Sequence, residues 1–249
     1  QASAPVWRLV QSLRCSVPSQ TDNCVGNSSA IEVTDYAYEA GNSSTPSNVL
    51  LKSVTRRSVD YSIIATTAYS YDTWGRVTKV DGPLAGDDDS SWYEYDHMGR
   101  VTLMTGPDPD ASGGMQHSYA AISYNDDGQT IEQESGSVNA PTGSRSFSPI
   151  SVATQFYDTY GRQQKTQLVD SSSAVISVSQ VSYDSVGRPE CAALRMSPTS
   201  YSSLPASACT QSGAGIDRIT KTFYDSYGRP WKATSAFGTS AARDQSVSY

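Results

Sequence analysis

The chain has 249 residues, of which 37 % are hydrophobic and 17 % are charged, and its formal net charge is −7. Because the basic residues are scattered along this acidic chain, we exclude binding to a phosphate backbone and expect no nucleic-acid partner. No run approaches about 18 apolar residues, so we expect no membrane insertion. Tyrosine is abundant, with 16 residues against 4 phenylalanines, which favours a sheet with one face wet.

The N-terminal part of the chain, up to Asp60, diverges from the pattern that fills the rest. It contains Trp7 and the closely spaced cysteines Cys15 and Cys24. We interpret residues 1–60 as diverged N-terminal repeats and residues 61–249 as regular repeats of one array, so that residues 1–249 form a single domain.

A six-residue motif, Tyr-Asp-x-x-Gly-Arg, recurs in the second part of the chain. Five near-perfect copies occupy residues 71–76, 95–100, 157–162, 183–188 and 224–229, and a degenerate copy, YNDDGQ, occupies residues 124–129. Spacings of this order indicate a repeat protein in which each unit is one supersecondary element. The sequence approaches the motif again and stops at Tyr249, so we expect the last repeat to be truncated.

Each motif is predicted to be the turn of a β-hairpin. Alternating aromatic and β-branched residues, which favour strands, precede and follow the copies, as in residues 68–71 and 77–80. The aspartate accepts backbone hydrogen bonds, the glycine supplies a positive φ, and the arginine pairs with the aspartate across the turn. The predicted turn residues are Tyr71, Asp72, Gly75, Arg76, Tyr95, Asp96, Gly99, Arg100, Tyr157, Asp158, Gly161, Arg162, Tyr183, Asp184, Gly187, Arg188, Tyr224, Asp225, Gly228 and Arg229.

The predicted fold is all-β, with tandem hairpins in one continuous, twisted and curved antiparallel sheet of roughly a dozen strands. Stacked repeats would align the motif tyrosines into a row of neighbouring rings across the strands. Segments rich in Ser, Asp and Gly, such as residues 86–91 and 111–114, are predicted to be loops. Residues 192–196 are the one segment in which the pattern allows a short helical turn.

The four cysteines form two local pairs, which predict two disulfides in an oxidising compartment. The pair of Cys15 and Cys24 encloses a short segment, and the pair of Cys191 and Cys209 encloses a longer one. Free thiols and a metal site are the alternatives. Neither pair has C-x-x-C spacing, and only His97 and His117 are available to complete a zinc site.

The motif series closely resembles the YD repeats of the RHS (rearrangement hotspot) family, secreted bacterial type, over residues 36–249. The resemblance implies a strip of hairpins that spirals into a hollow shell. Such shells enclose a C-terminal toxin in bacterial toxin systems, and a similar barrel serves cell adhesion in the animal teneurins. The family's shells contain many more repeats than these six or seven, and the core segment that follows them in the family has no match here.

We find no pattern that predicts catalysis, so we expect a protein that is not an enzyme and that needs no cofactor or metal. There is no G-x-S-x-G elbow, phosphate-binding loop or dinucleotide fingerprint. Glu94, Asp96, Glu132 and Glu134 supply carboxylates for a glycosidase pair, but we favour the structural interpretation, in which Asp96 forms its turn and Glu132 and Glu134 lie on a wet sheet face. The acidic segments at residues 87–89 and 108–110 lack a calcium-loop pattern.

The best binding hypothesis rests on three aromatic residues in the variable turn positions, Trp74, Tyr160 and Tyr227. If the turns lie side by side at one end of the strands, these rings form a row that can stack on a sugar or bind another protein. The alternative, which we favour, is that each ring covers its neighbouring repeat. Asn27 and Asn42 begin sequences of the N-glycosylation type, and the bacterial resemblance predicts that they stay unmodified.

The leading functional hypothesis is structural. We expect a secreted module, extracellular or at the bacterial cell surface, that builds a shell, tube or fibre wall by hairpin stacking, with head-to-tail strand pairing between copies. Its partner would be another copy or the rest of a longer RHS chain. The alternatives are a segment of a toxin-enclosing container, and an adhesion module that binds a surface glycan.

Overall fold

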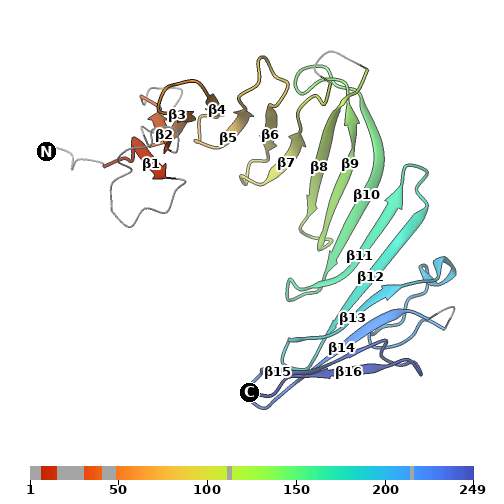
Figure 1. Ribbon diagram of the computed structural model, residues 1–249. Helices are drawn as coiled ribbons and strands as arrows, with labels where there is room; N and C mark the ends of the chain where they lie inside the picture. The colour runs from red at the N-terminus through yellow and green to blue at the C-terminus, as the bar shows by residue number, and fades with distance from the viewer. Residues whose placement is uncertain (1–6, 16–30, 41–48, 111–113, 214–215) are drawn as a thin grey trace, which may run out of the picture. The chain divides into compact units, whose positions relative to one another are not determined.

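The computed structural model describes residues 7–15, 31–40, 49–110, 114–213 and 216–249. Within these ranges the strands are hydrogen-bonded in chain order as one sheet of sixteen strands, from β1 to β16 (Figure 1). The pairings from β1 to β7 and from β10 to β16 are antiparallel. The predicted all-β fold of hairpins is confirmed, with more strands than the sequence suggested.

The strands alternate with short connections along nearly the whole described chain, and one 3₁₀ turn, η2 (Pro198–Ser200), interrupts them. Their bounds are β1 (Gln11–Cys15), β2 (Ile31–Tyr38), β3 (Leu51–Ser58), β4 (Ile64–Tyr71), β5 (Val77–Asp81), β6 (Ser91–Tyr95), β7 (Val101–Thr105), β8 (His117–Asn125), β9 (Thr130–Val138), β10 (Phe147–Tyr157), β11 (Gln163–Asp170), β12 (Val175–Tyr183), β13 (Pro189–Arg195), β14 (Arg218–Tyr224), β15 (Pro230–Ser235) and β16 (Arg243–Ser246).

The chain divides into two compact units. The first contains residues 1–119 and 137–147, and the second contains residues 120–136 and 148–249. Strands β1 to β7 therefore belong to the first unit and β11 to β16 to the second, while β8, β9 and β10 contribute to both. Among the residues that the structure describes, no helix is long and apolar enough to span a membrane.

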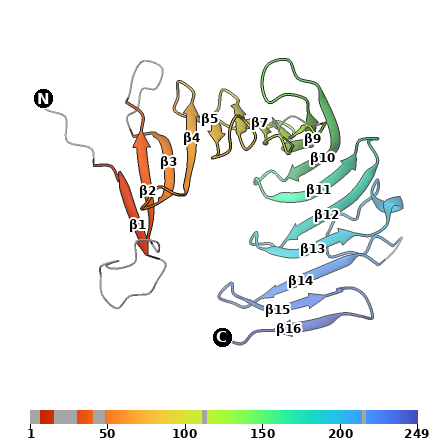
Figure 2. The ribbon, with the colours of Figure 1, turned by 45° about the horizontal axis from the view of Figure 1, so that its top comes forward.

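The motif turns of each unit lie along the same side of its sheet, at the ends of the strands. Successive connections in an antiparallel sheet alternate between the two opposite ends of the strands. The motif turns occupy every second connection, so they all lie at the same end. In the first unit these are the β4–β5 and β6–β7 connections, and in the second unit β10–β11, β12–β13 and β14–β15 (Figure 2). The long connection between β13 and β14, residues 196–217, begins at the opposite end of the strands.

The second unit has a small core on one face of the sheet. Directly paired residues on neighbouring strands point to the same face of a sheet. One such series of partners crosses the strands from β10 to β14 and consists of Phe156, Lys165, Gln180, Ala193 and Ile219. Ala193 and Ile219 are buried, together with two residues of the disulfide region, Cys191 and Ala208. Phe156 and Lys165 lie farther along the same face and are only half-buried. The core therefore sits where the 196–217 connection covers the strands.

The helical turn suggested for residues 192–196 is wrong. These residues belong largely to strand β13 (Pro189–Arg195) and pair with β12 on one side and β14 on the other. Alternate burial along the strand, with Cys191, Ala193 and Arg195 buried, shows the period of two that a strand requires. The only described 3₁₀ turn follows it, at η2.

In the diverged N-terminal segment, the described strands β2 and β3 pair in the same way as the strands that flank a regular motif. Tyr38 pairs with Leu51 after a bulge, as Tyr71 pairs with Val77. The N–H of Glu39 donates to the carbonyl of Leu50 at 2.9 Å, which is the bond that closes each regular turn. A long insertion between Glu39 and Leu50 thus replaces the four-residue step of the motif.

Candidate functional site

The motif turns are built around the aspartate side chain. In residues 184–188, one carboxylate oxygen of Asp184 accepts hydrogen bonds from the N–H groups of Val186 (3.0 Å) and Arg188 (2.9 Å). The other oxygen accepts a bond from Nε of Arg188 at 2.7 Å, and the N–H of Gly187 donates to the Asp184 carbonyl at 3.0 Å. The same bonds recur in the turns of Asp72, Asp96, Asp158 and Asp225.

The motif glycine meets two requirements. Its φ lies between 74° and 88° in the five regular turns, a region that residues with a Cβ rarely adopt. It also leaves room for the arginine of the preceding motif. A Cβ at Gly187 would stand 3.1 Å from a terminal nitrogen of Arg162, and one at Gly228 would stand 3.6 Å from Arg188.

The motif arginine links its own turn to the next repeat. While its Nε binds the aspartate of its own turn, the guanidinium lies over the ring of the next motif tyrosine. The distances from guanidinium carbon to ring centroid are 4.6 Å for Arg76–Tyr95, 4.3 Å for Arg162–Tyr183, 4.4 Å for Arg188–Tyr224 and 4.5 Å for Arg229–Tyr249. Each such arginine therefore stabilises two hairpins at once.

The motif tyrosine returns a hydrogen bond to the preceding repeat. Its hydroxyl donates to the carbonyl of the residue that follows the preceding arginine, over 2.7 to 2.8 Å. The pairs are Tyr95 to Val77, Tyr183 to Gln163, Tyr224 to Pro189 and Tyr249 to Pro230. Tyr71 makes the equivalent bond to Leu51 at 2.7 Å. At Tyr95, Tyr183, Tyr224 and Tyr249, ring and hydroxyl together fix the hairpin against the one before it.

The predicted row of neighbouring tyrosine rings is not what links the repeats. Among the described residues, no ring contact joins Tyr71, Tyr95, Tyr157, Tyr183 and Tyr224 to one another. Because hairpins repeat every second strand, about 10 Å apart, successive rings are too far apart to touch. The motif arginine of one repeat spans this distance and contacts the tyrosine ring of the next repeat, so guanidinium groups and tyrosine rings alternate from repeat to repeat.

The degenerate copy at residues 124–129 shows the importance of the arginine. Gln129 stands in the arginine position and adopts φ 52°. The next motif tyrosine, Tyr157, donates its hydroxyl to Gln155 of its own strand at 2.6 Å rather than to the preceding repeat. Its backbone N–H still donates to the Gln129 carbonyl at 2.9 Å, so the strands stay paired where the side-chain link changes.

The three turn aromatics are exposed, which corrects our preferred interpretation that each covers a neighbouring repeat. Trp74, Tyr160 and Tyr227 are 77 %, 82 % and 84 % exposed. Their rings lie 4.7, 5.0 and 5.3 Å from the guanidinium carbons of Arg76, Arg162 and Arg229 in their own turns. In the second unit, Tyr160 and Tyr227 therefore project from turns at the same end of the strands. The turn between these two carries the exposed Val186 at the same position.

The motif aspartates have lowered pKa values. Around Asp184, burial is the largest single influence and acts to raise the pKa, but the N–H and guanidinium of Arg188 and the N–H of Val186 together hold the pKa below its ordinary value of 3.8. The pKa is lowered in the same way at Asp72, Asp96 and Asp158. For Asp225 the backbone N–H of Arg229 is the largest influence, and it also lowers the pKa.

These pKa shifts predict that acid weakens the repeat turns. A carboxylate with a folded pKa below its unfolded pKa stabilises the fold above the unfolded value, and this stability is lost as the pH falls through the folded value. We expect the urea midpoint to decrease as the pH is lowered below about 4, and protons to be taken up on unfolding. Asp184→Asn should lower that proton uptake by up to one proton. The same uptake in wild type and variant would contradict the assignment.

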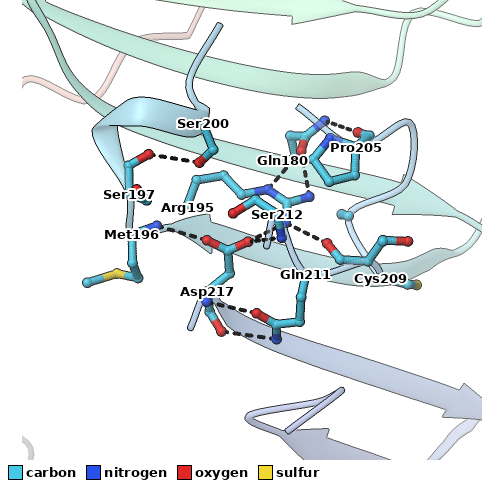
Figure 3. A network of polar contacts seen from close by, with 12 residues as sticks. Gln180, Arg195, Met196, Ser197, Ser200, Pro205, Cys209, Gln211, Ser212 and Asp217 are labelled. Atoms are coloured by element: carbon cyan, nitrogen blue, oxygen red, sulfur yellow. Dashed lines mark hydrogen bonds and ion pairs between the residues drawn. The ribbon is translucent and has the colours of Figure 1, made fainter. Parts of the chain in front are cut away.

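A second cluster of polar contacts, which the sequence did not reveal, lies under the 196–217 connection (Figure 3). Arg195 and Asp217 are fully buried and pair at 2.8 Å. The other N–H groups of Arg195 donate to Oε1 of Gln180 and to the carbonyls of Ser207 and Thr210. All five guanidinium donors are thus satisfied, as a buried arginine requires.

The carboxylate of Asp217 ties the two ends of the connection together. It accepts bonds from the N–H groups of Met196 at 3.0 Å and Ser212 at 2.8 Å. Burial, the largest influence, acts to raise the pKa of Asp217, but these bonds and the bond from Arg195 hold the pKa below its ordinary value. Cys191 and Cys209 form a disulfide in the same region.

The other candidate carboxylates lie in different settings. Glu94 pairs with Arg145 at 2.6 Å, Asp96 serves its turn, and Glu132 and Glu134 line a shallow pocket of about 270 Å³. No three His, Cys, Asp or Glu side chains of the described residues are grouped to hold a metal ion. Cys24, with its predicted bond to Cys15, and also Asn27 and Asn42 lie outside the described residues.

No protein-family model and no curated protein matches this chain. Among solved structures, the chain is similar to part of the crystal structure of TcdB2-TccC3-Cdc42, at 13 % identity and a TM-score of 0.40, over 88 % of this chain and 11 % of that one. It is also similar to part of the Photorhabdus luminescens Tc holotoxin pore, at 12 % identity and a TM-score of 0.30, over 84 % of this chain and 14 % of that one. The chain therefore spans about a tenth of these proteins, and the scores are too low for the likeness to bear on function.

Proposed function

We propose that this chain is a structural module of a secreted bacterial RHS protein, in which stacked hairpins form the wall of an extracellular shell, tube or fibre. The arginine-to-tyrosine link between repeats is the observation that carries the proposal. The arginine and tyrosine of the motif are engaged in joining one hairpin to the next, as in Arg188–Tyr224. A wall requires that every hairpin is held to its neighbours, and these contacts provide that continuity.

We further propose that the sheet continues beyond the two outer strands of the described part. β1 (Gln11–Cys15) and β16 (Arg243–Ser246) end the strand order, and the outer edge of such a strand offers N–H and C=O groups to another strand. Pairing β16 of one copy with β1 of the next is a head-to-tail contact, which gives a ring or an open filament. If a longer chain supplies the next strands instead, the array is a segment of a container that encloses a toxin.

Electron microscopy of the native material, with an intact mass for the same sample, tests this proposal. Rings, tubes or filaments built from units of 26.7 kDa would support pairing between copies. A hollow particle formed by one much longer chain would support the container. Isolated particles of the single chain, at any concentration, would overturn the proposal of a wall module.

The exposed turn aromatics support a second candidate function, binding of a surface glycan. Trp74, Tyr160 and Tyr227 offer exposed rings, and sugars bind proteins through such rings. Titration of soluble glycans should then give an affinity that Trp74→Ala and Tyr227→Ala weaken, while Val186→Ala at the same turn position changes it little. If no glycan binds the intact chain, this second function is wrong.

A further inference from the structure

A groove of about 620 Å³ opens on the second unit, between the sheet and the 196–217 connection. Its floor contains Lys165 on β11 and Gln180 and Ser182 on β12, and Lys165 and Gln180 are direct cross-strand partners. Phe156 on β10, the other cross-strand partner of Lys165, lies on the far side. Residues 204–207 of the connection form the opposite wall. Its volume is within the range of small-ligand sites.

The wall of the groove is held to its floor by several bonds. Nε2 of Gln180 donates to the Pro205 carbonyl at 3.2 Å, and the N–H of Ala208 donates to Oγ of Ser182 at 2.7 Å (Figure 3 shows the Gln180–Pro205 contact). The buried Arg195 and the disulfide of Cys209 hold the same segment from behind. A groove fixed in this way is preorganised, so a ligand would not have to order it.

Among the described residues that line this groove, Lys165 is the one cation without an acidic partner. Of the other charged residues there, Arg162 pairs with Asp158 at 2.7 Å and Glu190 pairs with Lys221 at 2.8 Å. The ammonium of Lys165 instead lies 3.7 Å from the ring centroid of Phe156. Lys165 is half-buried, and burial lowers its pKa, which reflects the cost of desolvating an unpaired charge. The groove therefore offers an incoming anion a single positive charge.

The contacts around Lys165 favour a carboxylate over other anions. Phosphate and sulfate sites generally use several cations or backbone N–H groups, whereas here one ammonium is unpaired. An acidic sugar would stack on an aromatic face, but the ammonium of Lys165 already covers a face of Phe156. The wall residues Leu204 and Pro205 suit the apolar side chain of a peptide. We propose that this groove binds an acidic peptide segment, one carboxylate of which pairs with Lys165.

The test is calorimetric titration of the full chain with a blocked pentapeptide, acetyl-Ala-Glu-Leu-Glu-Ala-amide, and with the same peptide carrying Gln in place of Glu. We expect binding of the glutamate peptide and an affinity loss on the order of tenfold or more in Lys165→Gln, since a bond to a charged group is lost. Lys165→Arg, which keeps the charge, should bind within a few-fold of wild type. Lys52→Gln, at an exposed lysine of the first unit, should change nothing.

Three results would overturn this site. The first is equal affinity for the Glu and Gln peptides, and the second is unchanged affinity in a folded Lys165→Gln variant. The third is binding of an oligoglucuronate or of sulfate while the peptide fails to bind at millimolar concentration. Circular dichroism of each variant separates loss of binding from loss of the fold. None of these outcomes depends on whether the chain forms a wall.

Discussion

Replacing Arg195 with methionine is expected to destabilise the second unit by about 3–5 kcal/mol, because it leaves the carboxylate of Asp217 buried without its cation. Three further acceptors, on Gln180, Ser207 and Thr210, lose their donor in the same step. The change should appear as a lower urea midpoint, and as faster amide exchange in peptides that cover β13 and β14, because repeat arrays can open locally.

Two variants distinguish the loss of the charge pair from a general disturbance of the core. Asp217→Asn in the Arg195→Met background removes the unpaired charge and keeps an oxygen for one of the two N–H groups, of Met196 or Ser212, which now donate to different oxygens, so it should restore part of the lost stability. Arg218→Met, at an exposed neighbour on β14, should change stability by less than about 0.5 kcal/mol. Equal losses in Arg195→Met and Arg218→Met would show that the buried pair does not stabilise the unit.

Removing the Cys191–Cys209 disulfide, by replacing both cysteines with alanine, is expected to destabilise the second unit by about 3 kcal/mol. The bond closes a loop with a sequence separation of 18, and a disulfide around a loop of this size stabilises by restricting the freedom of the unfolded chain. The two sulfur positions also border the small core formed with Ala193, Ala208 and Ile219. Urea denaturation without reductant measures the difference.

Reductant provides the control for this second prediction. It should lower the midpoint of the wild type to near that of the double-alanine variant. Any further effect of reductant on the variant itself reports on Cys15 and Cys24, whose pairing remains a prediction. A double-alanine variant as stable as the oxidised wild type would contradict the role given to this bond.

The hairpins could be predicted from the sequence because every determinant of a turn is local. The short motif contains the strand end, the hydrogen-bonding aspartate and the glycine with positive φ, and the structure places these groups accordingly at Asp184 and Gly187. The all-β fold follows, because strands joined by short turns pair with their neighbours in the chain. The pairing of Arg188 with Asp184 is equally local.

The contacts between repeats could not be predicted in the same way. The sequence pattern shows that Arg188 can reach Asp184 in its own turn, but nothing in it shows that the same side chain also reaches Tyr224 of the next motif. Arg195 and Asp217 belong to no motif and are far apart in the sequence. One signal was present: the gap between Tyr183 and Tyr224 is the longest between successive motif tyrosines, and it marks the connection that covers this pair and forms the groove.

The coupling between Arg188 and Tyr224 is the most direct test of the claim that each repeat is fixed to the next by the motif arginine. It is measured by a double-mutant cycle with Arg188→Gln and Tyr224→Leu, using urea denaturation followed by the fluorescence of Trp231 with the other tryptophans replaced by phenylalanine. We predict a coupling of about 0.5–2 kcal/mol, and a smaller one between Arg188 and Tyr183 of its own turn. Additive effects for Arg188 and Tyr224, with coupling only to Tyr183, would contradict the claim.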